Sequence, residues 1–409
     1  MVTERADRRS GVSWQPVSCN VELGLHGVIC AQMSAIETIA RAEHWLRPIL
    51  HRLPPRVAIG LFSRGRTAFA SWFGTHRVAG SESIAPFHRP VTAWGMQFNM
   101  PLWNAAGMFK KGEGYDVVAR QGAGAYVAGT TTSQARAGNT KEGIQWPAAA
   151  YPRSGVASNW MGLPNEGHAT VAARLALLTR VEGCPVGASV SADPGMPEPL
   201  ALPALIGGMQ LYDAAGVDYL ELNESCPNVE GHDTSHAALD AGLMARLRHV
   251  AQEFLQQRSR SLPVVVKFST DTDVDQIDTL VHTLIDLGFD GIILGNTSTK
   301  YAAVRSTIVP GERAVYDYFT SHFGGGLSGR PLRDRSLALC ARARLAADAA
   351  RPTHEFQVIR CGGVSTAADV IASRNVGVVL NQWYVGYFDG FAMHGDAVYE
   401  RLALELSAR

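Results

Sequence analysis

Hydrophobic positions along the chain form short apolar runs that alternate with longer segments of helical periodicity. The runs cover residues 103–107, 123–129, 185–190, 218–223, 263–268, 290–296, 356–361 and 377–382. The helical segments include residues 166–181, 237–254, 273–287 and 332–350. Unbroken apolar runs are typical of parallel strands buried on both faces, and such strands are connected by helices. The pattern therefore predicts an α/β fold with eight strands.

Closure of these strands into a (β/α)8 TIM barrel is the simplest arrangement of so many strand and helix pairs. A doubly wound open sheet is the alternative. Polar and glycine-rich residues follow nearly every run. A barrel places such loops together at its active-site rim, so their composition favours the barrel.

The segment before the first run has a different pattern. Ser34 and Glu37 have the spacing of a capping box, and apolar residues then recur at helical intervals on both sides of the break at 54–55. Arginines line the remaining positions. We expect an amphipathic helical hairpin at residues 34–76, followed by the barrel at 77–409. The hairpin could lie in a bilayer interface, or it could pack on the barrel with a solvated basic face.

Composition and charge narrow the class of protein. The formal net charge is +0, which gives no reason to expect a nucleic-acid partner, so small-molecule chemistry is the better expectation. Six cysteines without CxxC pairs or metal spacing indicate neither a disulfide scaffold nor a metal site. We therefore expect a cytoplasmic protein, or one bound peripherally to the inner face of the cell membrane. Residues 1–33 are expected to be disordered or to lie upstream of a start at Met33.

Chemically capable residues collect just after the apolar runs, where a barrel would bring them to one rim. They are Gly107 and Lys110 after the first run, Thr130 after the second, Asn223, Cys226 and Asn228 after the fourth, Lys267 in the fifth, Asn296 and Thr297 at the end of the sixth, and Gly362 and Gly363 after the seventh. Singly, each has an ordinary structural explanation, such as a turn-forming asparagine or an inert cysteine. Together, cations, amides and a thiol suit a planar anionic substrate rich in carbonyl and NH groups.

These stretches, taken in order, resemble the signatures of the dihydroorotate dehydrogenase family, over about residues 43–404. The matching stretches are 104–107 with Lys110, 112–113, 159–165, 222–228, 266–267, 296–297, 325–329 and 361–364. The resemblance implies FMN as cofactor and oxidation of (S)-dihydroorotate to orotate in pyrimidine biosynthesis, with a hydride passing to FMN N5.

The resemblance also assigns roles to individual residues. It makes Cys226 the base and Lys110 the partner of the substrate carboxylate. The remaining substrate contacts that it implies are Asn159, Met161, Gly162, Leu163, Asn223, Asn228, Asn296 and Thr297. The FMN contacts that it implies are Ala106, Gly107, Thr130, Asn223, Lys267, Asn296, Gly329, Gly362, Gly363, Tyr384 and Val385.

Physical chemistry supports these roles. Removal of a hydride from one ring carbon requires removal of a proton from its neighbour, so a base must face the substrate. Lys267 can stabilise negative charge on the reduced flavin, as a catalytic electrostatic group. Backbone NH groups hold a phosphate best where glycines let the main chain approach closely.

The chain combines features of two classes of the family. The hairpin and Lys110 resemble the membrane-associated class that uses quinone, whereas Cys226 and residues 161–164 resemble the soluble class. We expect quinone as the electron acceptor, with another acceptor left open. Other departures are Phe109, Trp160, Glu224, Arg360, Asn381 and a long connection at 299–323. They motivate two alternatives: a paralogue that acts on another cyclic amide or conjugated acid in a specialised pathway, and a noncatalytic membrane-associated flavoprotein.

Overall fold

The computed structural model describes residues 34–78, 90–224 and 240–408. Its centre is one parallel sheet of eight strands in the order β3-β15-β14-β12-β11-β10-β9-β4. The strands are β3 Leu102–Asn104, β4 Tyr126–Thr131, β9 Val186–Val190, β10 Tyr219–Asn223, β11 Val264–Phe268, β12 Gly291–Leu294, β14 Gln357–Cys361 and β15 Leu380–Trp383. Each overlaps one of the apolar runs, and the TIM barrel prediction is confirmed.

The barrel is closed between β3 and β4 partly by a side chain. Asn104, the last residue of β3, donates from Nδ2 to the carbonyl oxygen of Val127 at 2.8 Å and accepts the Val127 amide at Oδ1 at 3.2 Å. One asparagine amide therefore replaces a pair of backbone ladder bonds. Backbone hydrogen bonds from Gly107 N to Gly129 O and from Gly124 N to Leu102 O also connect the β3 and β4 segments.

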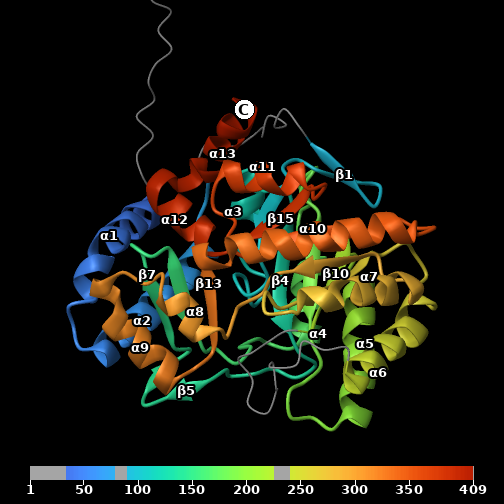
Figure 1. The fold of residues 1–409 in the computed structure, drawn as a ribbon, viewed down its shortest axis with the longest axis horizontal. Coiled ribbons are helices and arrows are strands. Elements are labelled where there is room, and N and C mark those ends of the chain that lie inside the picture. The colour runs from blue at the N-terminus through green and yellow to red at the C-terminus, as the bar shows by residue number, and fades with distance from the viewer. Residues whose placement is uncertain (1–33, 79–89, 225–239, 409) are drawn as a thin grey trace, which may run out of the picture. The chain divides into compact units, whose positions relative to one another are not determined.

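Helices connect the strands and cover the barrel (Figure 1). They are α3 Tyr115–Arg120, α4 His168–Ala176, α5 Glu198–Ala214, α6 Ala241–Val250 with a π turn at Ala251–Leu255, α7 Ile277–Asp286 after a 3-10 turn at Val274–Gln276, α10 Arg333–Ala350 after one at Arg330–Leu332, α11 Ala367–Asn375, α12 Val385–His394, and α13 Val398–Ser407 after one at Gly395–Ala397. The predicted helical segments are confirmed where they are described. The first is shorter than predicted and ends at Ala176, while residues 237–239 lie outside the described part of the chain.

Smaller sheets lie outside the barrel, and the hydrophobic pattern did not predict them. The largest has the order β13-β8-β7, built from Gly326–Gly329, Val156–Asn159 and Ala148–Tyr151, with both pairings antiparallel. Two hairpins, β1 Val91–Ala93 with β2 Met96–Phe98 and β5 Thr140–Lys141 with β6 Ile144–Gln145, complete the set that the structure describes.

The N-terminal hairpin consists of α1 Ala35–Leu50 and α2 Pro55–Phe73. The predicted capping box is present: Ser34 N donates to Glu37 Oε2 at 2.7 Å, and Glu37 N donates to Ser34 Oγ at 3.3 Å. α1 packs against α12, and α2 packs against β7 and α9, on one side of the barrel (Figure 1).

The long connection at 299–323 supports this hairpin. It forms α8 Tyr301–Arg305, a 3-10 turn at Pro310–Glu312 and α9 Arg313–His322. Val315 and Phe319 of α9 are buried in a second hydrophobic core together with Ile59 and Phe62 of α2. The extra length therefore builds a base for α2.

Candidate active site and adjoining cavity

A cavity lies at the carboxyl ends of the barrel strands, where a TIM barrel carries its chemistry. We call it the rim cavity. Its lining comprises Ala105, Ala106, Gly107, Lys110, Thr130, Asn159, Met161, Leu163, Asn223, Lys267, Asn296, Thr297, Ser328, Gly329, Cys361, Gly362, Gly363, Val364, Ser365, Trp383, Tyr384, Val385 and Gly386. These residues lie in or just after seven of the barrel strands, or in or just after β8 and β13 of the smaller sheet, so that distant parts of the sequence meet at one place.

With one exception, the described residues predicted for the site line this cavity. The exception is Gly162. Its φ of +70° and the Asn139 side chain, which a Cβ would approach to 2.1 Å, indicate that glycine is needed there for a tight turn. Cys226 and Asn228 lie outside the described residues. Their predicted roles stay predictions.

Prediction missed several lining residues. They are Ala105, Ser328, Cys361, Val364, Ser365, Trp383 and Gly386. Most belong to stretches that had already been singled out, such as 325–329 and 361–364. Their closeness in sequence to predicted residues could have indicated them. Closeness in sequence alone does not show which side chain of a loop faces the cavity.

Lys267 is held at the floor of the rim cavity by a buried polar cluster. The Nζ donates to Gln382 Oε1 at 2.9 Å and lies 3.8 Å from Glu221 Oε2, and Gln382 Nε2 donates to Glu221 Oε1. Lys267 is 2% exposed, and Glu221 is 0% exposed. Burial raises the pKa of Glu221, while the Lys267 charge opposes that rise. The cluster therefore fixes an ammonium group against the cavity wall.

A chain of amide side chains runs along the wall beside Lys267. Asn296 Nδ2 donates to Asn223 Oδ1 at 3.3 Å, and Asn223 Nδ2 donates to Thr130 Oγ1 at 2.9 Å. Thr297 Oγ1 is buried and has no hydrogen-bond partner among the described residues. Because a buried hydroxyl seldom stays unpaired, this atom suggests a ligand contact.

The cavity also has features that a flavin mononucleotide requires. Gly329, Gly362 and Gly363 line it with φ values of +105°, +107° and +76°. A Cβ at Gly363 would lie 2.4 Å from Arg333 N, so only glycine lets this loop pack as it does. At the same end, the start of α12 at Val385 contributes the amides and positive dipole of a helix N-terminus. A cation, an unpaired hydroxyl and a glycine-lined phosphate end fit FMN.

Three residues that suggested a modified substrate are explained by packing elsewhere. Phe109 is 4% exposed and stacks with Phe73 and Tyr126 at ring-centroid distances of 5.7 and 5.4 Å. The ring of Trp160 packs against Phe323 at 6.3 Å. Neither lines the rim cavity.

The third residue, Glu224, forms an ion pair with Arg246 at 2.9 Å and likewise does not line the rim cavity. Asn381 is buried and donates to the Pro101 carbonyl at 3.2 Å, away from the cavity. These contacts give Phe109, Trp160, Glu224 and Asn381 a packing role outside the rim cavity.

A second cavity, of about 340 Å³, lies between the hairpin and the barrel. We call it the hairpin cavity. Its hairpin side is mainly apolar, with Phe62, Phe69 and Trp72 among its lining residues. It shares five lining residues with the rim cavity, namely Asn159, Met161, Ser328, Tyr384 and Val385. The two cavities therefore adjoin.

Polar groups of the hairpin cavity are paired. Arg66 Nε donates to Tyr384 Oη at 2.9 Å, and Arg47 Nη1 lies 3.1 Å from Asp389 Oδ1. Burial raises the pKa of Asp389, and the Arg47 charge opposes that rise. On the outer side of the hairpin, Trp45 is 79% exposed. Within the described ranges, no helix combines the length and the hydrophobicity needed to cross a bilayer.

Comparison with known proteins identifies the family. The family profile described as "Dihydroorotate dehydrogenase" matches residues 90–406. The chain belongs to the dihydroorotate dehydrogenase family. As a member, it is an oxidoreductase that acts on a CH–CH bond.

Relatives extend the match over most of the chain. A "Dihydroorotate dehydrogenase (quinone)" of Methylococcus capsulatus is 30% identical over 347 residues, which are 84% of this chain and 94% of that protein. Another with that name, from Methylibium petroleiphilum, is 32% identical over 301 residues, 73% of this chain and 81% of the relative. A solved dihydroorotate dehydrogenase of Eimeria tenella in complex with ferulenol has a TM-score of 0.66 at 19% identity, covering 83% of this chain and 89% of its own. That structure supports the fold.

Proposed function

We propose that this chain oxidises (S)-dihydroorotate to orotate with FMN bound in the rim cavity, and that it passes the electrons to a quinone in the hairpin cavity. One observation carries the proposal. Lys110, Lys267 and the amide chain from Asn296 to Thr130 line one cavity that adjoins a second, largely apolar one.

The substrate is a planar ring with a carboxylate, carbonyl groups and NH groups. In the proposed complex, the Lys110 ammonium binds the carboxylate, because a charge-assisted hydrogen bond is stronger than a neutral one. The amides of Asn159, Asn223 and Asn296 donate to the ring carbonyls and accept from the ring NH groups. Thr297 Oγ1, buried without a partner in the described structure, completes this set.

The cofactor contacts follow from the same cavity. Lys267 and the glycine loops would hold FMN, with the phosphate toward Gly362, Gly363 and the start of α12. When bound, FMN supplies a two-electron acceptor for the hydride that leaves the substrate. Lys267 would supply a fixed positive charge beside the bound cofactor. Cys226 is the proposed base that takes the accompanying proton.

A quinone is the proposed acceptor because the hairpin cavity offers an apolar binding site next to the proposed flavin site. The relatives named "Dihydroorotate dehydrogenase (quinone)" support this choice. A quinone dissolves in lipid, and the exposed apolar side chains on α1 would let the hairpin rest in a bilayer interface. We therefore propose a peripheral membrane protein.

An anaerobic titration of the purified protein with dihydroorotate tests the substrate, the cofactor and the base. We expect the flavin absorbance to bleach. In Cys226→Ala, flavin should remain bound but bleaching should be lost, while Cys340→Ala, which alters a buried cysteine that does not line the cavity, should bleach normally. An unbleached wild-type spectrum would reject dihydroorotate as substrate.

A pair of helix glycines tests the quinone site. Neither Gly65 nor Gly60 has an atom within 4 Å of an added Cβ, and both belong to α2, but only Gly65 lines the hairpin cavity. Gly65→Phe should lower quinone turnover at least about tenfold while leaving bleaching unchanged, because the new ring fills the cavity. Gly60→Phe should retain both activities. Equal quinone rates in the two variants would exclude this cavity as the acceptor site.

A further inference from the structure

Arg360 is a buried arginine directly behind the proposed phosphate end of the rim cavity. It belongs to β14 and is 0% exposed, two residues before Gly362. A fully buried guanidinium is rare, because removal of a charge from water is unfavourable unless other groups compensate it. The position therefore requires a physical explanation.

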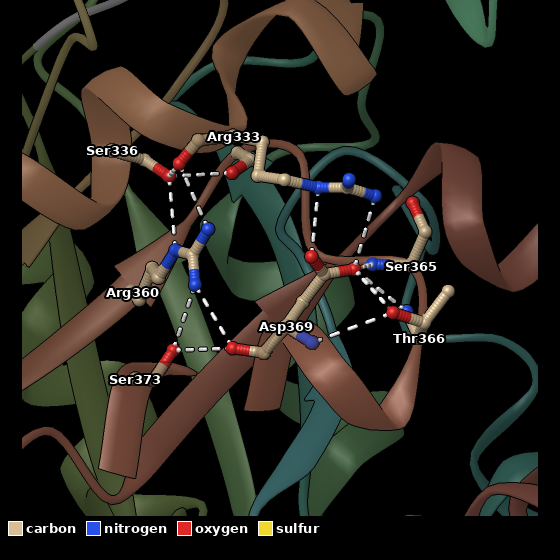
Figure 2. A network of polar contacts seen from close by, with 8 residues as sticks. Arg333, Ser336, Arg360, Ser365, Thr366, Asp369 and Ser373 are labelled. Atoms are coloured by element: carbon tan, nitrogen blue, oxygen red, sulfur yellow. Dashed lines mark hydrogen bonds and ion pairs between the residues drawn. The ribbon is translucent and has the colours of Figure 1, made fainter. Parts of the chain in front are cut away.

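All the hydrogen-bond acceptors of Arg360 are neutral (Figure 2). Nε donates to Ser336 Oγ at 3.0 Å, Nη1 donates to Ser373 Oγ and to the main-chain oxygen of Asp369 at 3.0 Å each, and Nη2 donates to the main-chain oxygen of Arg333 at 2.8 Å. In the part of the chain that is described, no carboxylate bonds to this guanidinium. Its hydrogen bonds are satisfied, but its positive charge is not neutralised by a direct partner.

The nearby carboxylate of Asp369 bonds to the far end of the loop that follows β14 and to Arg333, and not to Arg360. Asp369 Oδ2 accepts the amides of Ser365 and Thr366 at 3.0 and 2.9 Å, and Oδ1 lies 2.7 Å from Arg333 Nε (Figure 2). The loop from 361 to 366 is thus anchored at its far end by Asp369, while Arg360 lies at its near end.

Arg360 also reaches the glycine pair through one intermediate. Ser336 Oγ, which accepts from Arg360 Nε, donates to the carbonyl oxygen of Gly362 at 2.6 Å. The Gly362–Gly363 peptide is trans, so its carbonyl and its NH point in opposite directions. With the carbonyl turned toward Ser336, the Gly363 NH points away from it. That NH has no acceptor among the described residues, and Gly363 lines the cavity.

We propose that Arg360 is the positioning residue that makes this cavity select a phosphorylated flavin. The guanidinium acts through Ser336 to hold the Gly363 amide ready for the phosphate, and its charge favours a dianion at that end of the cavity. This inference rests on the proposed function, because it assumes that the cavity binds a flavin. It adds a specificity device: affinity for FMN depends on Arg360, whereas affinity for riboflavin, which lacks the phosphate, does not.

The test compares FMN and riboflavin binding to the full-length apoprotein by quenching of flavin fluorescence. Arg360→Met keeps the length and apolar stem of the side chain without its charge, and should lower FMN affinity about 10- to 100-fold. Riboflavin affinity should change less than about threefold. Arg360→Lys should recover part of the preference for FMN. Arg335→Met is the matched control, because Arg335, next to Ser336 on α10, also donates to main-chain carbonyls, at Thr270 and Thr272.

Each result decides the matter. Unchanged FMN affinity in Arg360→Met, or an equal loss for both flavins, would overturn the proposal. If Arg360→Met does not fold, Ser336→Ala decides, because it keeps the guanidinium but removes the hydroxyl that links Arg360 Nε to the Gly362 carbonyl; an unchanged ratio of the riboflavin and FMN dissociation constants would then overturn the proposal. Failure of the wild-type protein to bind either flavin would instead reject the proposed function, and this inference with it.

Discussion

The two adjoining cavities differ in polarity and in what encloses them. The rim cavity is built on barrel strands and presents lysine and asparagine side chains, each fixed by partners such as Gln382 and Thr130. The hairpin cavity is enclosed on one side by α1 and α2 and presents mainly aromatic and aliphatic surface. Rigid polar sites suit an anionic substrate, and an apolar slot suits a lipid-soluble acceptor. This difference supports the proposal that substrate and acceptor bind at separate places.

The largest expected effect comes from removal of the buried cation Lys267 from the rim cavity. Lys267→Met should slow flavin bleaching by dihydroorotate about 10²- to 10³-fold, because a preorganised charge is lost where negative charge develops. Burial already raises the pKa of Glu221, so that carboxyl can take up a proton when its partner is removed. Stopped-flow absorbance under anaerobic conditions measures the rate.

The same variant tests whether the two cavities act separately. Quinone should reoxidise chemically reduced Lys267→Met at a rate near that of the wild type. Lys111→Met serves as the control, because that lysine pairs with Glu166 at 3.1 Å and does not line the cavity. If Lys267→Met bleached at a rate within about threefold of the wild-type rate, the proposed electrostatic role of Lys267 would be rejected.

The next largest effect is expected on the outer side of the hairpin. Trp45 and Leu46 are 79% and 53% exposed. Replacement of both by serine should weaken binding to anionic liposomes about a hundredfold, since both side chains lose apolar contact with lipid. Sedimentation with vesicles measures the partition.

Exposed leucines elsewhere provide the control for this measurement. Leu177 and Leu345 are 86% and 64% exposed but belong to the barrel helices and their connections. Their double replacement by serine should leave vesicle binding unchanged. An equal loss in both double variants would mean that the hairpin has no special affinity for lipid.

The barrel was predictable from sequence, whereas much of the hairpin cavity wall was not. Strand β11 is apolar at successive positions because Val264, Val265 and Val266 are all fully buried, and burial on both faces leaves a clear signal. The sheet β13-β8-β7 gave no clear signal in the hydrophobic pattern, since its short strands pair across distant parts of the chain. Non-local pairing is not encoded in local periodicity.

Side-chain partners were equally hidden from the sequence. A motif indicated that Asn104 mattered, but only the fold shows that its amide bonds to Val127 and closes the barrel. Arg360 stood out as a departure, and its meaning depends on Ser336 and Ser373, which come from two different helices. Most residues that line the rim could be predicted because they lie at or near strand ends, whereas the contacts that support them could not.

A smaller effect is expected at the mouth of the substrate site. Lys110→Met should raise the dihydroorotate concentration for half-maximal bleaching about 30-fold, because one charge-assisted hydrogen bond to the substrate carboxylate is lost. Bleaching at saturation should be nearly unchanged. Lys111→Met is again the matched control, as the exposed neighbour in the same loop. A lower maximal rate with unchanged half-saturation would mean that Lys110 acts in the chemical step instead.

The smallest expected effect concerns the pH dependence of the free energy of unfolding. It compares two buried histidines, one in the barrel and one in the hairpin. His168, 1% exposed on α4, bonds through Nδ1 to Thr131 Oγ1 at 2.9 Å, and burial lowers its pKa to about 4. His51, at the end of α1, has its pKa lowered by burial, partly offset by its bond to the Ala150 carbonyl.

Because the folded pKa of His168 lies below its ordinary value of 6.5, the unfolded chain binds the proton first as the pH falls. The free energy of unfolding should therefore be highest above pH 6.5, decrease between pH 6.5 and about 4, and lose nothing more from this group below that. At pH 5 the loss should be about 1–2 kcal/mol, measured by urea unfolding across this range. His168→Gln should flatten the decrease, whereas His51→Gln should change it less, because the Ala150 carbonyl already favours the protonated form of His51. If His168→Gln unfolds with the pH dependence of the wild type, the acid sensitivity belongs to other groups than this barrel histidine.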